Sequence, residues 1–127
     1  MKILQWKKTD PPKFDNVPEK PGIYIISTRQ EVDGQYEVKY IGQTDNLRSR
    51  ANEHWSKKET NTELKAHLAE EYAMKFNYAE VALKPDREGM LLYMHQVYDP
   101  PFNPKAPLGE KVVKCTLPES VRKQIKV

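Results

Sequence analysis

Two runs rich in aromatic and β-branched residues flank an Asp33-Gly34 pair, and this arrangement constrains the fold more than any other feature of the sequence. The first run covers residues 23–26 and the second covers residues 36–41. Aromatic and β-branched residues favour strands, and an Asp-Gly pair supplies the positive φ angles of a tight hairpin turn. The sequence therefore predicts an antiparallel β-hairpin.

Helical patterns follow the hairpin. Thr44, Asp45 and Asn46 are suitable N-caps, and apolar residues then repeat every four positions at Leu47, Ala51 and Trp55. The other predicted elements are a second helix opened by a capping box at residues 60–63, a third strand over residues 76–83 and a third helix over residues 85–98.

This order of elements predicts an α/β fold of the α+β kind. Its sheet should be small, central, three-stranded and mainly antiparallel, flanked by about three helices in the order ββααβα. We expect an extended N-terminal lead-in over residues 1–16, one domain over residues 17–104 and a C-terminal extension over residues 105–127. That extension is expected to add a short strand near residues 112–117 and a helical turn after Pro118.

The composition is that of a folded protein, with 38% hydrophobic and 31% charged residues. No run of 18 apolar residues is present, which argues against a membrane-spanning helix. Cys115 is the only cysteine, so the chain forms no internal disulfide and no cysteine-based zinc cluster. The apolar stretch at the N-terminus is too short for a secretory signal. We therefore expect a cytoplasmic protein without a membrane partner.

Positive charge is concentrated near the C-terminus. Residues 104–127 carry six Lys and Arg residues against two acidic ones, whereas residues 21–103 carry ten against thirteen. A basic extension of this kind favours contact with a phosphate backbone, although the same residues also serve simply to keep a chain soluble. The candidate nucleic-acid-binding residues are Lys111, Lys114, Arg122 and Lys123.

The segment Pro21-Gly22-Ile23-Tyr24, followed by Tyr40-Ile41-Gly42, resembles the paired motifs of the GIY-YIG nuclease family. Residues 42–50 then resemble the family's G-x-x-x-x-L-x-x-R stretch, which ends here at Arg50. The resemblance covers about residues 17–104, with a longer interval than usual between the two tyrosines. Three further positions resemble those of the family's His, metal-binding Glu and terminal Asn, namely His54, Glu88 and Asn103.

This resemblance implies a metal-dependent endonuclease that hydrolyses DNA phosphodiester bonds with a single Mg²⁺ or Mn²⁺ ion. In that role Tyr24 would accept a proton from the attacking water, Arg50 would stabilise charge on the phosphate, and Glu88 would hold the metal. The full set of catalytic residues implied by the family pattern is Tyr24, Tyr40, Arg50, His54, Glu88 and Asn103.

Two alternatives remain open at the level of the sequence. One is a non-catalytic module that keeps the fold and binds nucleic acid or protein, and the other is a nuclease that acts on RNA or on branched structures. Each candidate residue also has an ordinary structural explanation: Tyr24 and Tyr40 as packing in strands, and Glu88 as a favourable charge in the first turn of a helix. The combination of all six in the order of the family favours the nuclease.

Overall fold

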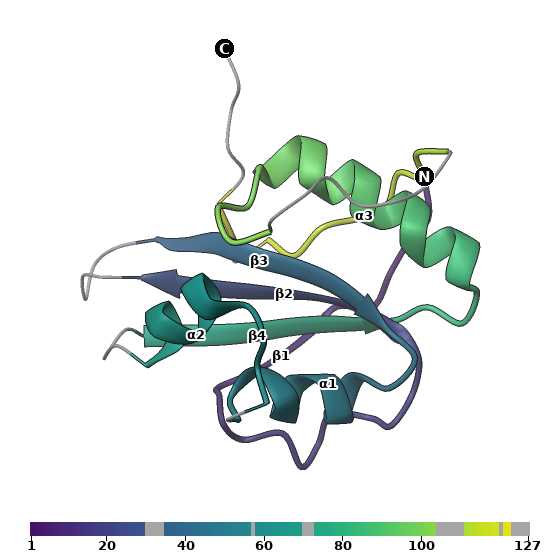
Figure 1. Ribbon diagram of the computed structural model, residues 1–127. Helices are drawn as coiled ribbons and strands as arrows, with labels where there is room; N and C mark the ends of the chain where they lie inside the picture. The colour runs from purple at the N-terminus through teal and green to yellow at the C-terminus, as the bar shows by residue number, and fades with distance from the viewer. Residues whose placement is uncertain (30–34, 57, 70–72, 104–110, 120, 123–127) are drawn as a thin grey trace.

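The computed structural model describes residues 1–29, 35–56, 58–69, 73–103, 111–119 and 121–122. Its centre is a sheet with the strand order β1-β4-β2-β3-β5 (Figure 1). Neighbouring strands are antiparallel except for β3 and β5, which are parallel. The strands are β1 (Lys7–Thr9), β2 (Gly22–Arg29), β3 (Tyr36–Thr44), β4 (Ala73–Glu80) and β5 (Val121–Arg122), and the helices are α1 (Leu47–His54), α2 (Thr62–Leu68) and α3 (Lys84–Tyr98).

The predicted α+β fold is confirmed, with one antiparallel strand more than expected. Strand β1 precedes the predicted hairpin and pairs with β4. The four antiparallel strands and the three helices therefore follow one another along the chain in the order βββααβα. The sequence gives no sign of β1 because it is three residues long, two of them exposed lysines, and it pairs only along the edge of β4. Such a strand lacks the alternation of apolar and polar residues by which strands are recognised.

Strands β2 and β3 form the predicted antiparallel pair, while the tip of the hairpin at Asp33-Gly34 lies outside the described residues. Tyr24 lies opposite Gly42, and Ile26 lies opposite Tyr40. Successive side chains of a strand point to opposite faces. Tyr24 and Tyr40 therefore lie on the same face of the sheet, in diagonal positions on neighbouring strands.

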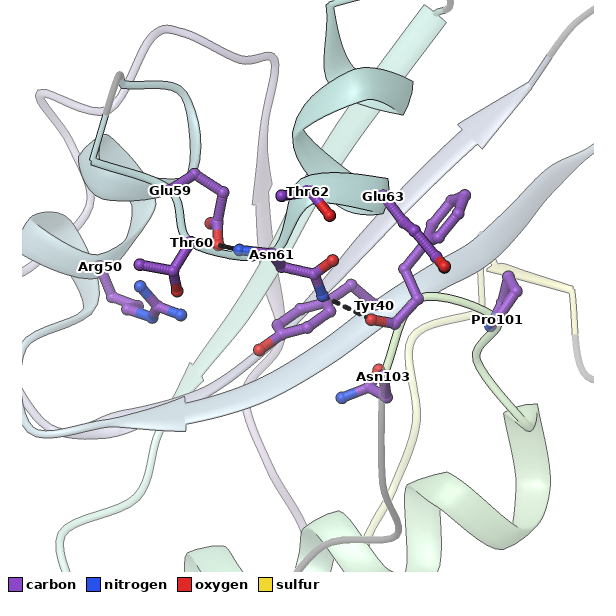
Figure 2. Close-up of a pocket in the computed structure, with 10 residues that line it drawn as sticks. Tyr40, Arg50, Glu59, Thr60, Asn61, Thr62, Glu63, Pro101 and Asn103 are labelled. Carbon is purple, nitrogen blue, oxygen red and sulfur yellow. Dashed lines mark hydrogen bonds between the residues drawn. The ribbon is translucent and has the colours of Figure 1, made fainter.

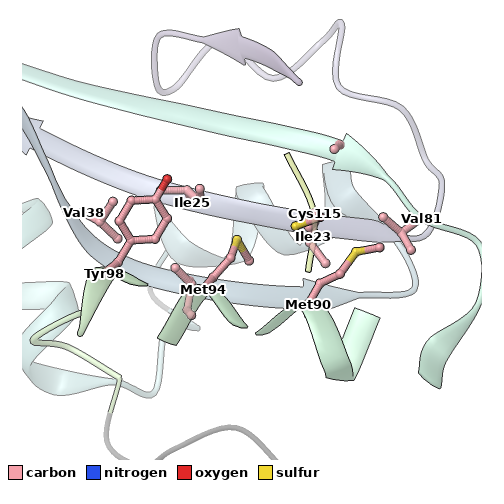
Figure 3. Packing of buried hydrophobic residues seen from close by; sticks show 10 residues of the cluster. Ile23, Ile25, Val38, Val81, Met90, Met94, Tyr98 and Cys115 are labelled. Atoms are coloured by element: carbon pink, nitrogen blue, oxygen red, sulfur yellow. The ribbon is translucent and has the colours of Figure 1, made fainter. Parts of the chain in front are cut away.

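The two faces of the sheet have separate cores. On one face, α3 packs Met90, Met94 and Tyr98 against Ile23 and Ile25 (Figure 3). On the opposite face, α1 and α2 cover the other set of strand residues (Figure 1). The second core joins the tyrosine motif to the helices through Tyr24, Ile26, Leu47, Ala51, Leu64 and Phe76.

The helix ends follow local chemistry. Asn46 caps α1 by accepting a hydrogen bond from the Ser49 amide at 3.0 Å, and Asn61 caps α2 by accepting one from the Leu64 amide at 3.1 Å. Helix α3 ends at Asp99, whose φ of 48° is left-handed. None of the helices in the described part of the chain is long and apolar enough to cross a membrane.

The C-terminal extension differs from its prediction. In place of a strand near residues 112–117, Cys115 makes an isolated bridge with Lys2. After Pro118, Val121 and Arg122 form β5. The rest of the predicted helical turn, at residues 120 and 123–127, lies outside the described residues. Both pairings are made to segments that are distant in the sequence, so local pattern alone does not predict them.

Candidate active site

The β2–β3 pair brings the two motif tyrosines together beneath α1. The rings of Tyr24 and Tyr40 are stacked with centroids 6.3 Å apart, as expected for a diagonal pair of long side chains. Tyr24 is 1% exposed. Tyr40 is less buried and lines a pocket of about 700 Å³ (Figure 2). The hairpin therefore presents one phenol in the interior and one at a surface pocket.

Gly42 makes the position of Tyr24 possible. A Cβ atom at Gly42 would lie 2.2 Å from the Tyr24 hydroxyl oxygen and 2.3 Å from the ring carbon that carries it. The Tyr24 ring thus crosses directly over the backbone of β3. The glycine of the second motif is required here by close approach of an aromatic side chain.

Helix α1 supplies Arg50 and His54, one turn apart, to the same place. His54 Nε2 lies 2.7 Å from the Tyr24 hydroxyl, and the edge of its ring faces Tyr40 with centroids 5.0 Å apart. On its other side, His54 Nδ1 contacts a carboxylate oxygen of Glu59. His54 and Glu59 are only 1% and 5% exposed. Tyr24, His54 and Glu59 therefore form a continuous buried chain of polar groups.

Nothing in the sequence distinguishes Glu59 as a site residue. It lies between α1 and α2, where no periodicity or motif distinguishes one glutamate from another. Its contact with His54 and its place in the lining of the pocket show that it belongs to this site.

Burial keeps the Tyr24–His54 pair neutral. Desolvation raises the pKa of the Tyr24 hydroxyl well above its usual value, with a further contribution from Tyr40. Desolvation, followed by the positive charge of Arg50, lowers the pKa of His54 to about 4, although Glu59 acts in the opposite direction. At neutral pH the phenol therefore keeps its proton and the imidazole is uncharged.

Arg50 forms one wall of the pocket (Figure 2). Its Nη1 donates to Glu53 Oε2 at 2.9 Å, and 29% of its side chain is exposed. Desolvation opposes its charge, but Tyr24 and Glu53 outweigh this effect and raise the pKa of Arg50. A fixed cation thus lies between the buried phenol and solvent.

Asn103 binds the segment Pro101–Asn103, which lines one side of the pocket, to β3. Its Nδ2 donates to the Ile41 carbonyl at 2.9 Å, and its Oδ1 accepts from the Ile41 amide at 2.9 Å. The Phe102 amide donates to the Lys39 carbonyl at 3.0 Å, and the Phe102 carbonyl accepts from Asn61 Nδ2 at 2.6 Å. Both hydrogen-bonding ends of the Asn103 amide are therefore engaged in placing the chain beside Tyr40.

A family model for the GIY-YIG catalytic domain matches residues 20–90, more than half of the chain. The protein belongs to the GIY-YIG family. The match begins at residue 20, just before the first motif, and runs through the first turns of α3. No curated protein and no solved structure gives a match. Membership implies nuclease activity, and GIY-YIG domains typically use a divalent metal ion.

Glu88, which resembles the metal-binding Glu of the GIY-YIG family, lies apart from the tyrosine pocket. It is on α3, which covers the opposite face of the sheet, and it does not line the pocket. The first turn of α3 is nevertheless fixed to the end of β3, because the buried Arg87 donates hydrogen bonds to Gln43 at 3.0 Å and to Asp45 at 2.7 Å. Glu88 therefore sits near the strand end that carries the second motif.

The carboxylates near this strand end differ in their availability to a metal. Among the described residues, no group of three His, Cys, Asp or Glu side chains is arranged to bind an ion. Glu53, Glu59 and Asp45 are in close contact with Arg50, His54 and Arg87. Glu88 is partly exposed, and its ion pair with Lys84 is longer, at 4.0 Å. One accessible carboxylate fits Mg²⁺, which takes most of its ligands from water and substrate phosphate.

Of the candidate basic residues, Lys111 and Lys114 have described side chains, and neither lines the pocket. Lys111 and Lys114 are exposed on a segment that follows α3, where the Val113 amide donates to the Gly89 carbonyl at 3.0 Å. The backbone of Arg122 belongs to β5, and Lys123 lies outside the described residues. The exposed lysines therefore accompany α3, on the face of the sheet opposite the tyrosines.

Proposed function

We propose that this protein is an endonuclease that hydrolyses DNA phosphodiester bonds with the aid of one divalent metal ion. The observation that carries the proposal is the Tyr24–His54 hydrogen bond, which lies beside Arg50 at a pocket in a GIY-YIG domain. A proton acceptor and a phosphate-binding cation are the two groups that hydrolysis of a phosphodiester requires from the protein.

Arg50 binds the scissile phosphate in this proposal. Its planar guanidinium offers paired donors that match two phosphate oxygens, and its partial exposure at the pocket leaves room for an anion. Glu53 holds the side chain by one nitrogen, Nη1. In the transition state, the positive charge offsets the negative charge that accumulates on the equatorial oxygens.

Tyr24 accepts a proton from the attacking water and passes its own hydroxyl proton to His54. Tyr40 lines the pocket beside Arg50 and orients that water. Asn103 acts on this arrangement indirectly, by keeping the Pro101-Phe102 wall of the pocket against β3. All four residues lie on or against the two motif strands, which makes their relative positions rigid.

Glu88 is the proposed protein ligand of the metal ion. The ion, when bound, supplies charge stabilisation to the phosphate and the leaving oxygen. This chain contributes Glu88, a partly exposed carboxylate near the end of β3 that lies 4.0 Å from Lys84 Nζ. Glu53 and Glu59 are in closer contact with Arg50 and His54 and have no part in metal binding in this proposal.

The test is a cleavage assay on linear, nicked, branched and single-stranded DNA and on RNA of matched sequence, with Mg²⁺ and with chelator. We expect Mg²⁺-dependent cleavage of DNA that is abolished in Arg50→Ala. Preferential cleavage of RNA or of branched DNA would replace the substrate proposed here. Binding without turnover on every substrate would show a non-catalytic module.

The metal ligand is tested by Glu88→Gln, which keeps the size of the side chain and removes its charge. We expect loss of Mg²⁺-dependent cleavage with an unchanged melting temperature, and Glu80→Gln serves as the control for loss of one exposed carboxylate. Cleavage at the parental rate by Glu88→Gln would remove Glu88 from the site.

A further inference from the structure

Building on the proposed nuclease function, we infer that Glu59 is a positioning residue that holds His54 in the tautomer able to receive the proton of Tyr24. The inference rests on the order of contacts in one buried line. The Tyr24 hydroxyl meets His54 Nε2 at 2.7 Å, and His54 Nδ1 meets Glu59 Oε2. Tyr24, His54 and Glu59 are 1%, 1% and 5% exposed, so water does not replace any of these contacts.

A hydrogen bond fixes one oxygen of the Glu59 carboxylate. Oε1 accepts from the Asn61 amide at 2.9 Å, and Asn61 in turn caps α2. Oε2 faces only the imidazole nitrogen among the contacts of the described residues. A buried carboxylate oxygen without a donor is costly. Glu59 therefore requires a proton on His54 Nδ1.

A proton on Nδ1 decides the chemistry at the other nitrogen. A neutral imidazole carries one N–H, so Nε2 is then an acceptor. The Tyr24 hydroxyl donates to it, which aligns the phenolic proton with the lone pair that will receive it. The opposite tautomer would direct an N–H at Tyr24 and leave its proton without an acceptor on His54.

The resulting proton transfers balance. Water gives one proton to the Tyr24 oxygen as its own oxygen bonds to phosphorus. The bond from phosphorus to the leaving oxygen breaks, and that oxygen departs with the electron pair and takes a proton from solvent. Tyr24 gives its original proton to His54 Nε2 and ends as a neutral phenol. His54 becomes an imidazolium with protons on both nitrogens, and the Glu59 carboxylate stabilises that charge without accepting a proton.

The groups around His54 couple this transfer to the substrate. Tyr24 faces it from β2, Tyr40 from β3, Arg50 and Glu53 from α1, and Glu59 from the loop that follows. Arg50 opposes protonation of His54 and Glu59 favours it. A phosphate bound to Arg50 would offset its positive charge, so His54 becomes a better proton acceptor when substrate is present.

The decisive experiment measures the tautomer of His54 by ¹⁵N NMR of imidazole-labelled protein without substrate. At pH 7 we expect Nδ1 protonated and Nε2 unprotonated in the parent protein. In Glu59→Gln, the amide oxygen keeps the Asn61 hydrogen bond and the amide NH₂ faces Nδ1, so the proton should move to Nε2. Glu80→Gln should retain the parental tautomer. A proton on Nε2 in the parent, or no change in Glu59→Gln, would overturn the inference.

Turnover provides the second measurement. Glu59→Gln should lower kcat by about 10²-fold or more, the scale of the proton transfer from Tyr24 to His54 that the wrong tautomer prevents, with a small effect on KM. Glu59→Asp keeps the charge and should recover part of the activity, whereas a purely structural role predicts no preference for Asp over Gln. Parental kcat in Glu59→Gln would also overturn the inference. If the parent cleaves no substrate, the proposed function fails, while the NMR result still decides the role of Glu59.

Discussion

Gly42 shows how one residue positions a reactive side chain. Tyr24 lies across its backbone on one side and stacks on Phe76, with ring centroids 5.3 Å apart, on another. The ring therefore has no free space into which it could move. Because a Cβ atom at residue 42 would overlap the hydroxyl end of Tyr24, a substitution there tests packing and chemistry together.

We expect Gly42→Ala to lower the free energy of unfolding by about 1–3 kcal/mol, the usual cost of overpacking a core. It should also reduce cleavage, because the Tyr24 hydroxyl is displaced from His54. Urea denaturation and single-turnover cleavage measure the two effects, with Ser49→Ala on the outer face of α1 as the control. A Gly42→Ala variant as stable and as active as its parent would show that Tyr24 does not occupy this position.

His54 makes stability depend on pH. Its pKa is about 4 in the folded protein and about 6.5 when unfolded. Between these values the unfolded chain binds the additional proton, so stability falls as the pH drops from about 6.5 to 4 and levels off below. The total loss of stability is roughly 3 kcal/mol.

Denaturation curves from pH 7 to pH 4 test this prediction. The parent should lose stability across that window, and His54→Gln should show a distinctly shallower slope. If His54→Gln keeps the full slope, the acid sensitivity originates in other groups and His54 is not held neutral by burial.

Arg50 and Trp55 separate chemistry from packing around α1. Arg50→Ala removes a partly exposed ion pair, so stability should change by less than about 1 kcal/mol, while turnover should fall by about 10²-fold or more. Arg50→Lys should restore little of the turnover, because a point charge lacks the paired donors.

Trp55 packs on the rings of Phe14 and Phe76, and Trp55→Ala should lower the free energy of unfolding by about 3 kcal/mol. Unfolding caused by Arg50→Ala would make Arg50 a structural residue.

At the scale of elements, Arg87 joins α3 to the end of β3. Its side chain is 2% exposed and donates to Gln43 and Asp45 and to the carbonyls of Val81 and Ala82. The interaction holds together three segments that are separate in the sequence. It therefore also sets where the neighbouring Glu88 lies relative to the second motif.

We expect Arg87→Leu to lower the free energy of unfolding by about 3 kcal/mol, because it leaves two carbonyls without their donor. Asp45 is 91% exposed, so Asp45→Asn should cost less than about 1 kcal/mol. Thermal unfolding of the two variants gives the comparison. Equal losses of stability would mean that the ion pair, and not the hydrogen bonds to the carbonyls, carries the effect.

At the scale of the whole molecule, the site and the exposed lysines of the C-terminal segment lie on different faces of the sheet. The tyrosine pocket is on the side of α1 and α2, while Lys111 and Lys114 follow α3 (Figure 1). A DNA duplex that meets both must therefore pass around an edge of the sheet. Removing Lys111 and Lys114 therefore tests whether bound DNA reaches the face of α3.

We expect the double variant Lys111→Ala/Lys114→Ala to bind DNA more weakly and with a weaker dependence on salt. The slope of log K against log salt concentration should decrease by about 0.9 for each phosphate that the variant no longer neutralises. Lys7→Ala/Lys8→Ala, which removes the same charge from the exposed edge strand β1, is the matched control. Equal slopes for the parent and both variants would show that these lysines serve solubility alone.

Local patterns in the sequence were enough to predict the hairpin, the three helices and the α+β class, because these depend on periodicity, capping residues and turn residues that act over a few positions. The motifs also selected Tyr24, Tyr40, Arg50 and His54, which the structure gathers around one pocket and its buried wall. These four residues lie on β2, β3 and α1, which are consecutive in the chain and are neighbours because the connections between them are short. Strand β1 and the C-terminal bridge were not predictable in this way, since each is made by pairing with a distant segment.

The contacts that define the site, in comparison, depend on the tertiary structure. Folding placed Glu59 against His54 and turned both ends of the Asn103 amide toward Ile41. It left Glu88 outside the pocket, on a helix whose core packs on the other face of the sheet. Such relations depend on the direction of side chains across a sheet and between packed elements. A sequence motif records the type and order of residues, but the hydrogen-bond partner of a buried group is chosen by which donor or acceptor folding brings within about 3 Å.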